Sequence, residues 1–164
     1  MRYILGLLLL LTFNGCKIGL NGASIPAEMK TINVRVFENN APLVVATLTP
    51  IFTEELKSRI RNQTSLRIST GDADGIFSGN ITRYDITPVA ITDNNRPTAG
   101  ANRLTIVVNV KYTNNLNPKQ SFEQPFERFK EFKLTNLASQ EPGLIKDVTA
   151  MLTEDIFNAA FAQW

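Results

Sequence analysis

The sequence predicts an α+β fold, a two-layer sandwich in which two helices pack on a four- to five-stranded, mostly antiparallel sheet. Apolar residues alternate over 104–112 with mostly polar neighbours, as in a half-buried strand. They recur about every 3.6 residues over 51–60 and again over 145–159, as in amphipathic helices. The chain of 164 residues is 43% apolar and 20% charged, which is typical of one ordinary globular domain.

The residue inventory excludes several kinds of chemistry. With no His and one Cys, the chain cannot form a Ser-His-Asp or Cys-His relay, a His/Cys zinc cage or an internal disulfide. Among the carboxylates, the spacing of Glu54, Glu55, Asp85 and Asp93 brings no two into one cleft. The common glycine-rich phosphate motifs are absent, and a net charge of +2 does not indicate nucleic-acid binding. We therefore expect no enzyme, no metal site, no cofactor and no nucleic-acid partner.

The first 15 residues predict a secretory signal peptide. A positive start precedes Ile4–Leu11, an apolar stretch shorter than the ~18 residues that a transmembrane helix needs. Next, Phe13-Asn14-Gly15-Cys16 resembles a bacterial lipobox, in which cleavage precedes the Cys and its thiol is acylated. The alternative is ordinary cleavage near Gly22-Ala23, which would discard Cys16. Lipidation at Cys16 predicts stable membrane attachment, because each buried CH₂ contributes about 0.8 kcal/mol.

Behind the signal, residues 16–30 predict a flexible tether and residues 31–164 a single domain. The tether is rich in Gly, Asn and Ser and shows no sustained period. A first strand is expected where Ile32, Val34 and Val36 alternate with more polar neighbours. Asn39-Asn40-Ala41-Pro42 should end it.

A helix is expected at 50–62. Thr49 is placed to cap it and Pro50 suits its first turn. Acidic residues come early and basic residues late, which matches the helix dipole. Glu55 and Arg59 are spaced for an i,i+4 ion pair.

Three more strands should follow. The first covers 66–68, and a tight turn at 71–75 leads into a long strand over 76–91. We read Asp72-Ala73-Asp74-Gly75 as this turn, because a calcium loop would need an oxygen ligand where Ile76 stands. The apolar positions of the long strand change face after Ile81 and again near Pro88, which indicates bulges or a bend. A loop over 92–102 joins it to the strand at 104–112.

The C-terminal third contains one ambiguous segment and one clear helix. Over 121–132, phenylalanines fit both helical and strand spacing, and Pro125 favours a strand that ends irregularly. At least one of these rings should be exposed. A final helix is expected to open near Glu141-Pro142, with a buried stripe. That stripe is Ile145, Val148, Leu152, Ile156 and Ala159.

A modest concentration of basic side chains is the only candidate ligand contact. Lys57, Arg59, Arg61 and Arg67 could meet the phosphate groups of a lipid headgroup. The plainer interpretation of the same residues is a solvated helix end.

Several segments together resemble the LptE-like lipopolysaccharide-assembly lipoproteins, in the form found in Bacteroidetes-type bacteria. Their order and spacing along the chain carry the resemblance more than any one of them. They are Leu48-Thr49-Pro50, Thr53-Glu54-Glu55-Leu56, Gly79-Asn80-Ile81-Thr82-Arg83-Tyr84, Arg103-Leu104-Thr105-Ile106-Val107-Val108, Asp155-Ile156-Phe157-Asn158 and Trp164.

The resemblance implies a non-enzymatic outer-membrane lipoprotein, with Cys16 as the acylated residue. It also implies a partner, the LptD β-barrel, which the protein would plug and help to assemble for lipopolysaccharide transport to the cell surface. The chain would then sit on the periplasmic side of the outer membrane or within the barrel lumen. Two alternatives stay open: a stand-alone periplasmic lipoprotein that binds a small lipid or glycan, and a carboxylate hydrolase. An apolar pocket between helices and sheet would favour the first.

Overall fold

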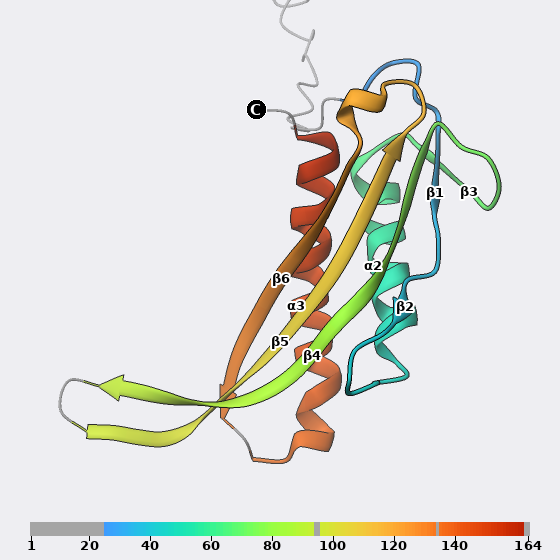
Figure 1. The fold of residues 1–164 in the computed structure, drawn as a ribbon. Helices are drawn as coiled ribbons and strands as arrows, with labels where there is room; N and C mark the ends of the chain where they lie inside the picture. The colour runs from blue at the N-terminus through green and yellow to red at the C-terminus, as the bar shows by residue number, and fades with distance from the viewer. Residues whose placement is uncertain (1–24, 94–95, 134, 163–164) are drawn as a thin grey trace, which may run out of the picture.

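The computed structural model describes residues 25–93, 96–133 and 135–162, with side chains for 25–89, 101–133 and 135–162. The predicted signal peptide, Cys16 and Trp164 lie outside the described residues. Figure 1 shows one elongated body in which two helices lie along the same face of a twisted sheet. The predicted class, α+β with two layers, is confirmed.

The N-terminal half forms a parallel unit. Strand β1 (Thr31–Val34) and the short β2 (Glu38–Asn39) precede helix α2 (Leu48–Gln63) and strand β3 (Arg67–Ser69). β3 returns parallel to β1 with Ile68 beside Ile32. Helix α2 forms the crossover connection that two parallel strands, β1 and β3, need.

The C-terminal half forms an antiparallel meander closed by a long helix. Strands β4 (Gly75–Asp93) and β5 (Arg96–Asn114) make a long hairpin. A short 3₁₀ helix η1 (Pro118–Gln120) leads to strand β6 (Phe122–Lys133) and helix α3 (Leu137–Phe161). The segment with ambiguous spacing, 121–132, is therefore a strand from Phe122 onward, without an irregular end.

The sheet is mixed, although most of its paired residues are antiparallel, as predicted. Its strand order is β3-β1-β4-β5-β6, and β2 pairs with β4 off this path, which makes six strands. β1 and β2 pair parallel with β4, whereas β4, β5 and β6 are antiparallel to one another. The alternation of apolar residues shows which face of a strand is buried but does not show the direction of its neighbour, so the parallel pairing of β1 and β2 could not be predicted from it.

The core lies between the helices and one sheet face. Phe77 of β4 and Tyr112 of β5 stack at 4.7 Å between ring centroids, and Phe161 of α3 meets Tyr112 edge-on at 5.8 Å. Such aromatic pairs add to the free energy gained from burial alone. The core also includes Met29, which is 3% exposed and whose sulfur lies 3.8 Å from the Tyr112 hydroxyl. The folded part therefore reaches back into the stretch that we interpreted as tether.

Strand β4 changes face at two register shifts. One lies between Ile81 and Arg83 and the other between Val89 and Ala90. The first leaves both Ile81 and Tyr84 fully buried although they are three residues apart. The bulges predicted from the change of apolar face are confirmed, and such bulges add twist to a hairpin.

Gly79 of β4 allows a close approach between strands. Its φ is +155°, and a Cβ atom there would lie 2.0 Å from the backbone oxygen of Asn109. Any side chain would force β4 away from β5 at this point, so the register of the hairpin depends on glycine here.

Several predicted boundaries and contacts are wrong. Helix α2 is flanked by Thr47, not capped by Thr49, and Thr47 makes no side-chain cap. Helix α3 begins at Leu137 and contains Pro142, so the proline does not mark its start.

Two apolar assignments also shift by one residue. Val36 is 67% exposed and Phe37 is fully buried instead, because β1 ends at Val34. On α3, Ala160 is buried and Ala159 is exposed.

Candidate functional site

The four basic residues singled out from the sequence are not equivalent in the structure. Lys57 donates to Glu54 Oε1 at 2.8 Å, and an Arg61 nitrogen lies 3.9 Å from Glu54 Oε2. These bonds to Lys57, together with the nearby charges, hold the pKa of Glu54 below its usual value. Arg67 lies on β3 and is exposed. Lys57 and Arg61 thus share one carboxylate at the surface.

Arg59 points away from that surface and joins the two helices. Its guanidinium donates to the Ala150 carbonyl at 2.9 Å and to Thr153 Oγ1 at 3.2 Å on α3. Its side chain is 14% exposed, and Glu154 lies 4.0 Å from it. The predicted pair with Glu55 is replaced by these contacts, because the packed partner helix offers a less hydrated site.

A polar cleft of about 460 Å³ lies where β1 extends past the end of β3. Arg35 and Lys57 contribute cationic groups to it, Asp72 a carboxylate, and Asn33 and Ser69 neutral polar groups. The Asn33 amide donates to the Gly71 carbonyl at 2.7 Å and so holds the loop after β3 over β1. The cleft lies at the rim of the sheet.

A second cleft, of about 480 Å³, lies between β6 and α3. Phe129, Ala150 and Met151 give it an apolar lining, and Lys130 pairs with Asp147 across it. This cleft is also at a rim. Fully buried side chains lie between the helices and the sheet, and both of these clefts are at the rim, so neither is the internal apolar pocket that would favour a small-lipid binder.

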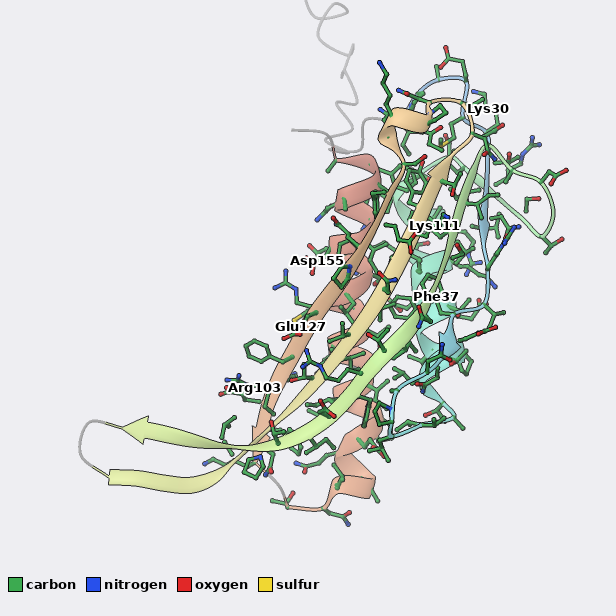
Figure 2. The ribbon with its side chains drawn as sticks, in the orientation of Figure 1. Lys30, Phe37, Arg103, Lys111, Glu127 and Asp155 are labelled. Carbon is green, nitrogen blue, oxygen red and sulfur yellow. The ribbon has the colours of Figure 1, made fainter. Side chains whose placement is uncertain are left out.

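The sheet face opposite the helices carries a cross-strand array of ion pairs. Arg103 of β5 stands directly opposite Glu131 of β6, with a nitrogen–oxygen distance of 2.5 Å. The Arg103 guanidinium also lies 4.3 Å from the ring centre of Phe129, which is 48% exposed. Figure 2 shows Arg103, Lys111 and Glu127 spread along this part of the sheet. The remaining pairs are Arg83 with Glu127, Arg83 with Asp85, and Lys111 with Glu123.

We call this set the ion-paired face: Arg83, Asp85, Arg103, Lys111, Glu123, Glu127 and Glu131. This face exposes many hydrogen-bonding groups. Because its positive and negative charges nearly balance, it produces only a weak net electrostatic field. Sequence reasoning missed it, although the signal exists. Once β6 is known to be a strand, Glu123, Glu127 and Glu131 fall on one face and Arg128 and Lys130 on the other.

The two buried tyrosines serve the core and not proton transfer. Burial, with the hydrogen bond to Glu141, raises the pKa of Tyr84 well above its usual range. Its hydroxyl donates to Glu141 Oε1 at 2.7 Å. Burial raises the pKa of Tyr112 to about 12. Both phenols therefore stay protonated near neutral pH.

The described residues contain no cluster of three or more His, Cys, Asp or Glu side chains that could hold a metal ion. Of the two helices described, neither has the length and apolar character needed to cross a membrane.

A family model described as LptE, lipopolysaccharide-assembly, matches residues 29–160. The chain belongs to the LptE family. This is a family of non-enzymatic lipoproteins, and membership supports, at a coarse level, a role in lipopolysaccharide assembly. The match spans every described helix and strand, although α3 continues one residue past it.

Solved structures share the LptE-type fold at low sequence identity. A minor lipoprotein from Acinetobacter baumannii is 13% identical with a TM-score of 0.51, over 79% of this chain and 91% of its own. The hypothetical protein CT253 from Chlamydia trachomatis is 9% identical with a TM-score of 0.56, over 82% and 99%. The uncharacterized lipoprotein B from Nitrosomonas europaea is 12% identical with a TM-score of 0.50, over 82% of each chain. Among curated proteins, none matches.

Proposed function

We propose that this LptE-family chain is an outer-membrane lipoprotein that plugs an LptD-type β-barrel and helps it to assemble and to pass lipopolysaccharide to the cell surface. The observation that carries the proposal is the family match over residues 29–160. The ion-paired face supports it physically. The lumen of a large barrel is polar, and a plug with balanced, hydrogen-bonding surface groups can enter it without burying an uncompensated charge.

The proposed anchor is an acyl group on Cys16. A tether from Cys16 to the fold would hold the domain near a membrane-embedded barrel and raise its effective concentration there. Cys16→Ser should move the protein from the membrane fraction to the soluble fraction of broken cells. Mass spectrometry of the mature N-terminus should find acylated Cys16. A mature chain that begins near Gly22-Ala23 would exclude this anchor.

Co-purification tests the barrel partner. The full-length chain, extracted from its own membranes in mild detergent, should bring down a large β-barrel protein in a defined ratio. An unrelated lipoprotein carrying the same affinity tag serves as control. If no large barrel is enriched over the control, the proposed function fails.

The basic residues that remain available are proposed to contact lipopolysaccharide phosphates. Arg61 is half-exposed, Arg67 is exposed and the Lys57 side chain is 23% exposed, whereas Arg59 is held by α3. The triple variant to Gln should bind purified lipopolysaccharide more weakly than wild type. Replacing Arg83, Arg103 and Lys111 by Gln removes the same charge from the other face and serves as the matched control. Equal loss in both variants would show a nonspecific charge effect.

A further inference from the structure

Strand β1 has a free edge beyond the end of β3. Figure 1 shows β1 and β3 at one margin of the sheet, on the opposite side from β6. Their pairing ends at Asn33 opposite Ser69, and past that point no described strand pairs with β1 on this side. On its other side β1 stays paired with β4, through Val34 opposite Phe77. One side of β1 is therefore occupied and the other is free.

Two backbone groups point to the free side. Arg35 N donates to the Phe77 oxygen at 2.9 Å, which extends the pairing with β4 by one residue. Backbone groups of successive residues in a strand point to alternate sides, so the Val34 carbonyl and the Val36 N–H point away from β4. The Lys30 carbonyl, four residues before Val34, accepts Arg67 N of β3 at 2.9 Å on this same side, as the alternation requires.

The chain itself does not use these two groups, because Gly71 turns away from them. In the parallel register of β1 and β3, the residue opposite Arg35 would be the second one after Ser69, which is Gly71. Instead, Gly71 N donates to Ser69 Oγ at 3.2 Å, and the Gly71 oxygen accepts the Asn33 amide at 2.7 Å. Both backbone groups of Gly71 are thus satisfied within the loop, and β1 keeps an unpaired edge.

The polar cleft of about 460 Å³ lies against this free edge. Val34, Arg35 and Val36 line it, as do the loop at 69–72 and Lys57 of α2. The Val36 side chain is apolar and 67% exposed, so it can cover part of a bound chain. A cleft of this volume is large enough for a short extended stretch of polypeptide beside β1.

The charges of the cleft favour a carboxylate at Arg35. Arg35 is exposed and forms no ion pair with a described residue, whereas Lys57 already pairs with Glu54. Asp72 is the one acidic residue of the lining and lies in the loop. A second copy of the chain fits poorly, because residues 29–37 contain Lys and Arg but no Asp or Glu, and two such edges would bring like charges together.

We propose that this edge binds an extended segment of another protein, which adds to β1 as a further strand and places an Asp or Glu side chain at Arg35. Main-chain hydrogen bonds to Val34 and Val36 hold the segment, and the charge of Arg35 selects an acidic one. The inference goes beyond the proposed function and does not rest on it, because the occupant is defined by its extended backbone and its carboxylate.

Hydrogen exchange of the full chain in detergent tests the free edge. In the chain alone, the Val36 N–H should exchange several-fold faster than the Arg35 N–H, which is bonded to Phe77. Equal protection of the two amides would show that Val36 is bonded within the fold, and the inference would fail.

Site-specific photo-crosslinking in living cells tests the occupant. A photoreactive residue replaces Val36 in one strain and, in the control, Leu116, an exposed apolar residue after β5. We expect position 36 to give a protein adduct in several-fold higher yield, and mass spectrometry should map it to a segment that contains Asp or Glu. Equal yields, an adduct with lipid alone or with a second copy of this chain, or a segment without a carboxylate each overturn the inference.

Charge reversal tests the role of Arg35. With the photoreactive residue kept at position 36, Arg35→Glu should lower the adduct yield several-fold at an unchanged melting temperature. The control is Lys119→Glu, an exposed cation in η1, which should keep the full yield. Equal yields from the two variants would contradict the acidic contact. An acidic segment from a protein other than a barrel supports this inference and gives no support to the proposed function, so the two are tested separately.

Discussion

At the scale of single residues, Gly79 is the described glycine at which an added side chain would clash most severely. Because a Cβ would meet the Asn109 backbone oxygen at 2.0 Å, neither a rotamer change nor a small side-chain shift can relieve the clash. Gly79→Ala should lower the free energy of unfolding by more than about 3 kcal/mol, measured by urea titration. Gly143→Ala is the control, because nothing lies within 4 Å of its added Cβ. On helix propensity, that control should gain about 0.5–1 kcal/mol. Similar values for the two variants would contradict the close approach.

Asp74 ties the start of β1 to the start of β4. Its carboxylate accepts the backbone amides of Lys30 at 2.8 Å and Thr31 at 2.9 Å, and the Thr31 hydroxyl at 2.9 Å. These hydrogen bonds hold the pKa of Asp74 below its usual value. The stability that they contribute is therefore present above the unfolded-state pKa, about 3.9, and is lost as the pH falls through the lower folded-state pKa.

Asp74→Asn should therefore be less stable than wild type at neutral pH, and the difference should vanish in strong acid. Urea midpoints of both proteins, measured from pH 7 down to about pH 2, check this. Asp72→Asn changes an exposed residue in the neighbouring loop, so its urea midpoint should vary with pH as that of wild type does. A difference for Asp74→Asn that stays constant with pH would mean that the carboxylate charge is not what Lys30 and Thr31 bind.

At the scale of elements, Arg59 determines how α2 and α3 meet. Arg59→Ala leaves the Ala150 carbonyl and Thr153 hydroxyl without this donor in a mostly covered site. The free energy of unfolding should fall by about 1.5–3 kcal/mol. Arg61→Ala, an exposed position on the same helix, should change it by less than about 0.5 kcal/mol. Equal effects would show that Arg59 contributes only as an exposed helical residue.

Strand β6 is joined to α3 by a two-bond ion pair. Arg128 donates to both oxygens of Asp155 at 2.5 and 2.7 Å, and this pairing raises the pKa of Arg128. Both groups are partly exposed, so solvent screens them. A double-mutant cycle with Ala at each position should give a coupling of about 0.5–1 kcal/mol that shrinks in high salt. A coupling of zero at low salt would contradict a persistent bond between strand and helix.

The spacing of apolar residues correctly predicted the helices and strands that bury one continuous face along their length. Residues 104–112 alternate cleanly and lie inside β5, and the helical stripe from Ile145 to Ile156 lies on α3. The errors fall where another interaction decides the local structure. Val36 alternates correctly with Val34, yet β1 stops and the chain bends to form β2, so Phe37 is the residue that enters the core. Strand direction is set by the loops and partners of a strand, which the pattern within it does not report.

At the scale of the whole molecule, the site was harder to predict than the fold. The four basic residues were chosen because they are close in sequence, but helix rotation directs Arg59 to α3 while Lys57 and Arg61 share Glu54. The ion-paired face depends on which residues of β4, β5 and β6 stand opposite one another. That register follows from the bulge after Ile81, whose position a single strand's pattern only approximates.

Stability should vary along the β4–β5 hairpin. Its inner part is flanked by β1, β2 and β6, whereas beyond Val89 and Ala99 the two strands have only each other among the described strands. A lone two-stranded ribbon is marginally stable in water. Hydrogen exchange should therefore be fast at Ala90–Thr92 and slow at Val108–Tyr112. Equal protection in the two segments would mean that the outer hairpin opens only with the whole domain.

The sheet order also constrains when the domain could form if the chain is exported with its N-terminus first, as the proposed anchor requires. β1 is the first described strand along the chain, and both of its neighbours, β3 and β4, come later. The face of β5 and β6 that becomes the core stays uncovered until α3, the last element described, arrives. A chain that emerged from a membrane with its N-terminus first would thus expose an apolar sheet face until almost all of it had emerged, and a chaperone that covers apolar surface would then limit its aggregation.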